Sequence, residues 1–227
     1  MSDLLQALLD AGQKPVLHQF WRSSATWRVR WALLIKQVPF EIHSVNLLAN
    51  EQNLPAHRAR SPVGTVPALQ LGERFLTESV AILEWLERAR PAPALYPADP
   101  WTAARVRQLV EVVNSEIHPL QSGAVRKRVS PDEAAQAAWT KEFNQRGVEA
   151  LAEAVRMIDL ELGEGRFLVG DSLTAADLFA VPQLDFARRF GVDTAKFARL
   201  TAAEGAALAT GHAAASRPEH QPGAPAQ

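Results

Sequence analysis

Residues 15–47 read PVLHQFWRSSATWRVRWALLIKQVPFEIHSVNL. An apolar run of strand length over 15–20 precedes residues 26–37, where apolar side chains recur on one face at helical spacing. Pro39 ends that pattern, and alternating apolar residues over 40–47 indicate a second strand. The short connections between these elements predict a βαβ unit with parallel strands and a right-handed crossover.

The following residues predict the remaining strands of the same domain. Residues 66–71 and 74–76 are two short strands joined by a tight turn, which indicates an antiparallel hairpin, and Ser79 opens a helix. Pro67 stands near the head of the first of these strands, where proline is rare in a central strand. We therefore predict a turn with a cis peptide bond there, and a βαβ unit followed by a ββα unit.

Alanine usage divides the chain into two parts. Residues 1–75 hold 8 alanines and residues 76–227 hold 31, and alanine is the strongest helix former. The second part is therefore predicted to be nearly all helix, over 101–129, 132–163 and 174–190. Four prolines within 90–100 indicate a linker, and low complexity after Thr210 indicates a mobile tail. The expected organisation is an N-terminal extension 1–13, an α/β domain 14–92, a linker 93–100, an all-helical domain 101–210 and a flexible tail 211–227.

The composition excludes several kinds of function. The 227 residues carry 24 Lys and Arg against 25 Asp and Glu, which argues against attraction to nucleic acid or anionic lipid. No apolar stretch is long enough to span a membrane, and the N-terminus makes a poor secretory signal, so we expect a cytoplasmic protein. Six unpaired histidines and no cysteine predict no metal site and no cysteine nucleophile. Thiol chemistry would therefore need sulfur from a bound molecule.

Three short segments are candidates for chemistry. Ser23 and Ser24 precede a helix, whose N-terminus favours an anion, although serines there are usually helix caps. The residue before a cis proline, Val66, would leave its backbone free to pair with an extended peptide. Glu78 and Ser79 begin another helix, where a carboxylate and a hydroxyl could hold an α-amino-acid group. The alternative is that the Glu78 carboxylate only compensates the helix dipole. No glycine-rich phosphate loop and no GxSxG sequence is present.

In this order, the three segments resemble those of glutathione transferases, and most closely those of the zeta class. Residues 23–30 match the signature SSCxWRVR, with Ala25 in place of its cysteine. The other matching segments are Ser61–Leu69, Glu78–Glu87, Val169–Asp171 with Thr174–Asp177, Val181–Gln183 and Ala187–Phe190. The resemblance covers residues from about 14 to 208. It implies a thioredoxin-like N-terminal domain, an all-helical C-terminal domain and a homodimer.

The resemblance also implies that glutathione is bound, mainly by the first domain. Ser24, with Ser23 close by, would hold the glutathione sulfur as a thiolate. Val66, beside cis-Pro67, would pair with the cysteinyl backbone, while Glu78 and Ser79 would take the γ-glutamyl group. The further glutathione-binding candidates are Gln52, near the glycyl end, and His118 and Gln121, on a helix that lines the cleft. For His118, a histidine before a helix kink is an equal alternative.

The implied activity is cis–trans isomerisation of a maleyl compound, maleylacetoacetate to fumarylacetoacetate, by reversible addition of the thiolate. Arg189 stands where the class has a carboxylate-binding arginine, and Arg22 is a second candidate for the substrate carboxylates. Maleylpyruvate, and α-haloacids as transferase substrates, are alternatives, as is a non-catalytic glutathione-binding homologue. Ala25 excludes chemistry that needs a protein thiol at that position, but isomerisation needs only the sulfur of glutathione.

Overall fold

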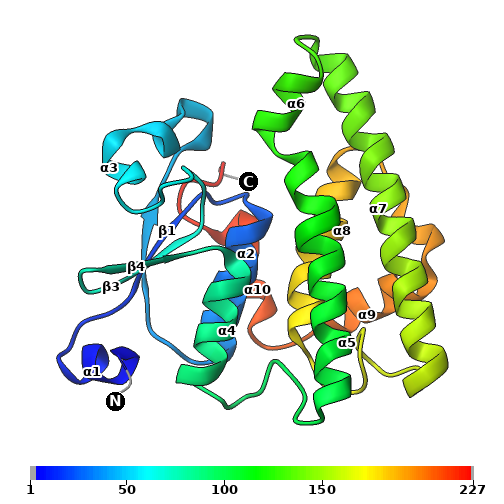
Figure 1. Cartoon of the computed structure of the whole chain (residues 1–227), viewed down its shortest axis with the longest axis horizontal. Coiled ribbons are helices and arrows are strands. Elements are labelled where there is room, and N and C mark those ends of the chain that lie inside the picture. The colour runs from blue at the N-terminus through cyan, green and yellow to red at the C-terminus, as the bar shows by residue number, and fades with distance from the viewer. Residues whose placement is uncertain (1–3, 226–227) are drawn as a thin grey trace. The chain divides into compact units, whose positions relative to one another are not determined.

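The structure, a computed structural model, describes residues 4–225 and divides the chain into two compact units (Figure 1). Unit 1 runs through Ala94 and resumes at Gly211, and unit 2 is Leu95–Thr210. The division after Ala94 falls within the stretch 93–100 that the prolines mark as a linker. No helix in residues 4–225 has both the length and the apolar character required to cross a membrane.

Unit 1 is built on a four-stranded mixed sheet in the order β2-β1-β3-β4. Its strands β1 and β2 are parallel, while β3 runs antiparallel to both β1 and β4. The predicted βαβ-ββα arrangement and the cis bond between Val66 and Pro67 are confirmed. The strands are β1 (Val16–Gln19), β2 (Glu41–Ser44), β3 (Ala68–Leu71) and β4 (Arg74–Thr77).

Helices α2 (Ser24–Ile35) and α4 (Ser79–Ala89) pack together on one face of this sheet, and α3 (Pro55–Arg58) lies on the other (Figure 1). Short 3₁₀ turns at Leu47–Ala49 and Glu51–Asn53 connect β2 to α3. The residues before the sheet form α1 (Leu4–Asp10), which contacts β3 and buries Leu5. The N-terminal extension is therefore helical from residue 4 and is part of unit 1.

Helix α2 is buried on nearly all sides, beyond the one face on which its apolar residues recur. Every residue from Ser24 to Leu33 is buried, including Arg28 and Arg30. Helix α4 covers one side, Arg30 reaches Gln19 of β1, and the C-terminal helix α10 (Ala213–Ser216) also packs on α2. Sequence periodicity identifies the apolar face of this helix but does not report a distant segment that returns to cover its polar side.

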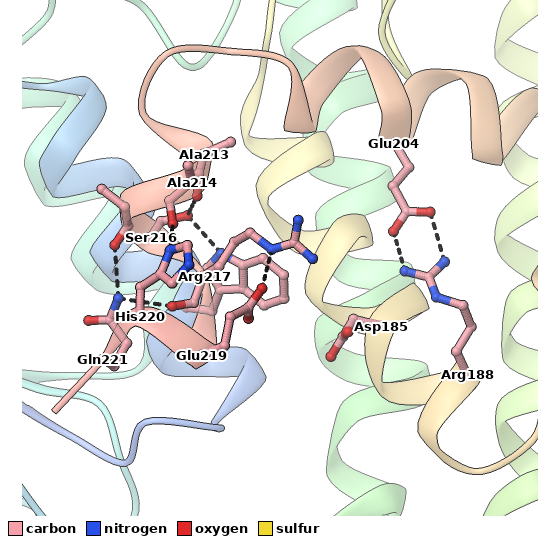
Figure 2. A network of polar contacts seen from close by, with 12 residues as sticks. Asp185, Arg188, Glu204, Ala213, Ala214, Ser216, Arg217, Glu219, His220 and Gln221 are labelled. Atoms are coloured by element: carbon pink, nitrogen blue, oxygen red, sulfur yellow. Dashed lines mark hydrogen bonds and ion pairs between the residues drawn. The ribbon is translucent and has the colours of Figure 1, made fainter. Parts of the chain in front are cut away.

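The expectation of a flexible tail is wrong for residues 211–225. The indole Nε1 of Trp27 donates to Oγ of Ser216 at 2.8 Å, and Nε of Arg30 donates to the Ser216 carbonyl at 3.0 Å. The tail is also held by hydrogen bonds within itself, which Figure 2 shows. In these, Nε2 of Gln221 donates to the carbonyls of Ala215 and Arg217. Buried donors on α2 thus hold a segment whose composition alone predicts disorder.

Unit 2 is all helical, with α5 (Pro100–Glu111), α6 (Gly123–Val129), α7 (Glu133–Leu162), α8 (Ala175–Arg189) and α9 (Ala198–Leu208). The continuous helix predicted over 101–129 is wrong. A π-helical turn at Val112–Ile117 and a 3₁₀ turn at His118–Gln121 separate α5 from α6. Pro119 explains the interruption, because proline lacks an N–H and its ring clashes with the preceding turn.

A capping box formed by Thr174 and Asp177 begins helix α8. The buried carboxylate of Asp177 accepts hydrogen bonds from the N–H and Oγ1 of Thr174 at 2.8 and 3.0 Å. Its other oxygen accepts the Leu168 N–H at 3.0 Å, which ties the preceding loop to the helix. One side chain therefore fixes both the start of α8 and the loop before it.

Candidate functional site

Strand register brings the three candidate segments of unit 1 to one edge of the sheet. His18, near the end of β1, pairs with Ala68 at the start of β3, and Ala68 pairs with Thr77 at the end of β4. The residues that follow β1, precede β3 and follow β4 therefore lie at the same edge. These are the Ser23-Ser24, Val66-Pro67 and Glu78-Ser79 segments, so the structure brings these three candidate segments together.

The first segment is the N-terminus of α2. Ser23 is its N-cap, and the Ser23 Oγ accepts a hydrogen bond from the Thr26 N–H at 3.3 Å. Ser24 is the first helical residue and is 5% exposed. Among the described residues, none accepts a hydrogen bond from the backbone N–H of Ala25. The helix end thus offers a hydroxyl group, an unpaired N–H and the positive end of the helix dipole to an anion.

The second segment presents the backbone of Val66. Neither its N–H nor its C=O is paired with any residue from 4 to 225, although the residue is 8% exposed. The neighbouring Thr65 is held on both sides, because its N–H donates to Ser61 Oγ at 3.1 Å and its carbonyl contacts Nε2 of His57 at 2.9 Å. A residue with an unpaired backbone donor and acceptor is suited to pairing with the backbone of a peptide ligand.

The third segment lies between β4 and α4. Glu78 is exposed at the N-terminus of α4 with φ of 67°, a positive value that is uncommon for residues other than glycine. Ser79 is buried, and its Oγ accepts a hydrogen bond from Nη1 of Arg28 at 3.2 Å. Since arginine can only donate, the proton of the Ser79 hydroxyl is directed elsewhere. The hydroxyl is therefore prepared to donate to a ligand carboxylate.

The guanidinium of Arg28 adds positive charge behind Ser79. The side chain is fully buried, and burial lowers its pKa to about 9. This pKa keeps Arg28 cationic at neutral pH, so it favours binding of an anion at Ser79. Arg30, two residues later, has its pKa lowered to about 9 by burial and donates to Gln19, to the Trp21 carbonyl and to the tail.

We predict that replacing Ser79 by alanine raises KM for glutathione by about tenfold and changes kcat little at saturating glutathione. The lost interaction is a hydrogen bond to a charged group, typically about 1.5 kcal/mol or more. Steady-state kinetics over a range of glutathione concentrations measure this effect. Ser172→Ala, at an exposed position in unit 2, is the matched control, and equal KM values for both variants would contradict the assignment.

Gln52 and Arg22 also belong to unit 1. Gln52 lies in the 3₁₀ turn after β2, and its Oε1 is buried without a partner in the described part of the chain. Such an unpaired acceptor agrees with a ligand-binding role near this turn. Arg22 is exposed in the loop between β1 and α2, where its guanidinium stacks over the Trp21 ring at 5.3 Å from the centroid. It stays a predicted substrate-binding residue.

Three further predicted site residues belong to unit 2, namely His118, Gln121 and, described below, Arg189. His118 begins the 3₁₀ turn after α5, and Gln121 ends it. Gln121 is buried, and its Oε1 accepts a hydrogen bond from Nε2 of Gln183 on α8 at 2.9 Å. Both residues stay predicted members of the glutathione site.

Two adjacent arginines end α8 and have different partners. Arg188 makes a two-pronged contact with Glu204 of α9, at 2.5 and 2.8 Å (Figure 2). Arg189 makes an ion pair with Asp185 one turn earlier, at 3.2 Å, and its guanidinium lies over the Phe186 ring. Arg188 therefore serves the packing of α8 on α9. A partly exposed i, i+4 pair is weak, and Arg189 stays the predicted substrate-binding arginine.

The site residues predicted from the sequence do not include the buried polar side chains that hold them in place. Arg28 and Arg30 lie inside the SSATWRVR segment, where an arginine on a helix is ordinarily expected to face solvent. The signal was the presence of two arginines in a helix otherwise rich in tryptophan, leucine and valine. Gln183 and Asn144, the buried partners behind Gln121, carry no local signal, because their contact depends on packing between helices.

Comparison with protein families agrees with this geometry. Residues 17–94 match the model of the glutathione S-transferase N-terminal domain, and residues 135–209 match that of the C-terminal domain. The maleylpyruvate isomerase of a Ralstonia species is 40% identical over 84% of this chain and 90% of its own length. The maleylacetoacetate isomerase of Mus musculus is 35% identical over 94% of this chain and 97% of its own.

Solved structures give the same result. The maleylacetoacetate isomerase of Anaeromyxobacter dehalogenans, with glutathione bound in its active site, is 42% identical, with a TM-score of 0.83. That comparison covers 93% of this chain and 98% of the other. A bacterial maleylpyruvate isomerase described as a zeta-class glutathione S-transferase is 36% identical over 92% of this chain and 100% of its own, with a TM-score of 0.87. The chain therefore belongs to the glutathione S-transferase family and, within it, to the zeta class, as its motifs predict.

Proposed function

We propose that this protein is a glutathione-dependent isomerase that converts a maleyl compound, maleylacetoacetate, to its trans isomer. The observation that carries the proposal is the meeting of Ser23-Ser24, the unpaired Val66 backbone and the Arg28-supported Ser79 at one sheet edge. Relatives named for maleylacetoacetate and for maleylpyruvate isomerisation support the substrate class. A relative with glutathione bound in its active site supports the cosubstrate.

The side chains and backbone of unit 1 fit glutathione part by part. Val66 offers one N–H and one C=O, which match the cysteinyl backbone of a peptide. Ser79, with the positive charge of Arg28 behind it, and the carboxylate of Glu78 match the opposite charges of a γ-glutamyl group. Gln52 has a buried amide oxygen that lacks a partner among residues 4–225, and we assign it to the glycyl end.

When bound, glutathione supplies the thiolate that adds reversibly to the cis double bond, which can then rotate as a single bond and re-form as trans. The protein's part is to keep that sulfur ionised and to hold the substrate carboxylates. The Ser24 hydroxyl favours the anion by about 1.5–3 kcal/mol, and the start of α2 favours it by about 1 kcal/mol. Together they lower a thiol pKa by roughly two to three units. The Ala25 N–H adds a donor that does not depend on a cysteine side chain.

The direct test compares the two maleyl substrates on the purified protein. We expect retention on immobilised glutathione, isomerisation of maleylacetoacetate followed spectroscopically, and no turnover when glutathione is omitted. Faster turnover of maleylpyruvate would assign that substrate instead, and turnover of α-haloacids alone would indicate a transferase. Retention without turnover of any of these substrates would favour a non-catalytic glutathione-binding homologue.

We predict that Arg189→Ala lowers kcat/KM for maleylacetoacetate by about tenfold or more and leaves KM for glutathione unchanged. The reason is the loss of a charge-assisted hydrogen bond to a substrate carboxylate. Arg156→Ala on α7, an exposed arginine in a similar short-range ion pair with Glu153, is the matched control. Unchanged kcat/KM for both maleyl substrates in Arg189→Ala would remove this residue from the mechanism.

The resemblance supports further proposals about the cellular setting. We propose that the protein is a cytoplasmic homodimer acting in aromatic amino acid catabolism, through homogentisate, or in gentisate degradation if maleylpyruvate is the substrate. Sedimentation of the purified protein tests the dimer. The order of the neighbouring genes tests the pathway.

A further inference from the structure

A chain of buried side-chain amides lies behind Gln121 in unit 2. Asn144 on α7 donates through Nδ2 to the Thr140 carbonyl at 2.8 Å, and its Oδ1 accepts from Nε2 of Gln183 at 2.7 Å. The same Gln183 nitrogen donates to Oε1 of Gln121 at 2.9 Å. Asn144 and Gln183 are fully buried, and Gln121 is 3% exposed.

The orientation of every amide in this chain follows from one backbone atom. A carbonyl can only accept, so the Thr140 oxygen requires the amino group of Asn144 to face it. The oxygen of Asn144 must then face Gln183, and Gln183 must donate to it through its amino group. That amino group in turn requires the oxygen of Gln121. Turning any one amide over would place two oxygens or two amino groups together.

The consequence is an amide donor with a fixed direction. No residue in the described chain accepts a hydrogen bond from Nε2 of Gln121. The Oε1 of Gln183 is buried without a partner among these residues. The Gln121 Nε2 atom is not among the buried unpaired atoms of the described chain, so this donor keeps access to a ligand at the surface.

We propose that Gln183 is a positioning residue that, with Asn144, fixes the Gln121 amide so that its amino group donates to an oxygen of the bound ligand. The oxygen is a carbonyl or carboxylate, on glutathione or on the maleyl substrate. The proposal deepens the proposed function and rests on it for the identity of these ligands. Gln121 contacts the ligand, and Gln183 sets the direction in which the Gln121 amino group points.

The test uses Gln183→Met and Gln121→Met, which keep side-chain length and remove the amides, together with the double variant. We expect each single variant to raise one KM by about tenfold, with kcat changed less than twofold. The double variant should be no worse than Gln121→Met alone, because both changes remove one contact. A rise in KM for glutathione or for maleylacetoacetate identifies which ligand carries the oxygen.

Asn144→Leu tests whether the hydrogen bond from Gln183 to Asn144 sets the orientation of Gln183. Asn144 itself makes no hydrogen bond to Gln121 among those described above. The Asn144→Leu variant should raise the same KM as Gln183→Met. Unchanged KM values in Gln183→Met, or effects that multiply in the double variant, would overturn the proposal. If the wild-type protein isomerises neither maleyl substrate, the proposed function fails, while titration calorimetry with glutathione and side-chain amide exchange of Gln183 by NMR still test the relay.

Discussion

Ser24→Ala is expected to lower kcat/KM for isomerisation at neutral pH by about 10- to 100-fold. Removing the hydroxyl takes away a charge-assisted hydrogen bond to the glutathione thiolate, worth about 1.5–3 kcal/mol. The pH at which kcat/KM is half-maximal should rise by about one unit or more, since 1.36 kcal/mol corresponds to one pKa unit. The pH profile and the ultraviolet absorption of the bound thiolate measure this change.

Ser23→Ala is the informative comparison for Ser24→Ala. Ser23 caps α2 through the Thr26 N–H, so its loss should cost about 1 kcal/mol of stability. We expect a smaller kinetic effect from Ser23→Ala, because its oxygen is engaged by the helix. A wild-type pH profile in Ser24→Ala with a shifted one in Ser23→Ala would transfer the sulfur contact to Ser23. Wild-type kinetics in both variants would contradict a serine-stabilised thiolate.

The largest loss of stability is expected from Asp177→Ala. The carboxylate accepts three hydrogen bonds inside unit 2, and its removal leaves two backbone N–H groups and a hydroxyl buried without an acceptor. We expect the free energy of unfolding to fall by about 3–5 kcal/mol. The midpoint of thermal unfolding should fall by roughly 10 °C.

The matched control for Asp177→Ala is Asp171→Ala. Asp171 also accepts a backbone hydrogen bond, from the Arg166 N–H at 3.0 Å, but it is exposed. Its loss should cost at most about 1 kcal/mol, since water can replace it. Equal unfolding midpoints for the two variants would show that the Asp177 network does not stabilise the fold.

Asp177 should also make stability depend on pH in an unusual direction. Burial raises its pKa to about 6 in the folded protein, although its hydrogen bonds oppose that rise. A raised pKa means that the unfolded state loses its proton first, so stability from this group is complete below about pH 4. It is lost as the pH rises through about 6. Measured against Asp177→Asn, the unfolding free energy should therefore decline by about 2–3 kcal/mol across this window.

Local patterns predict the elements of unit 1 well, because each strand and helix there has a clear period and clear ends. Gly72, Pro39 and cis-Pro67 mark turns whose geometry depends on neighbouring residues. The errors occur where a distant segment decides the outcome. The burial of Arg30 depends on Ser216, which is 186 residues away in the chain. The helix interrupted around Pro119 is the opposite case. The proline is a local signal for a break, but the helix-forming composition of residues 101–129 led to the prediction of one continuous helix.

The candidate site likewise has features that local sequence predicts and features that depend on distant residues. Ser24, Val66, Glu78 and Ser79 could be proposed from short motifs, since each lies at a turn or helix start that its neighbours define. Their meeting at one edge follows from strand register, which the order of parallel and antiparallel strands predicts. The direction of the Ser79 hydroxyl and of the Gln121 amide could not be predicted, because each depends on a buried partner from another helix.

The return of the chain to unit 1 after Thr210 has a consequence for synthesis on the ribosome. The chain emerges from its N-terminus, so the sheet and α2 are available long before residues 211–225. Until those residues appear, the Trp27 indole and the Arg30 guanidinium lack Ser216, to which both donate in the finished protein. The half of the protein whose synthesis starts first is therefore the last to be completed, after all of unit 2 has been made.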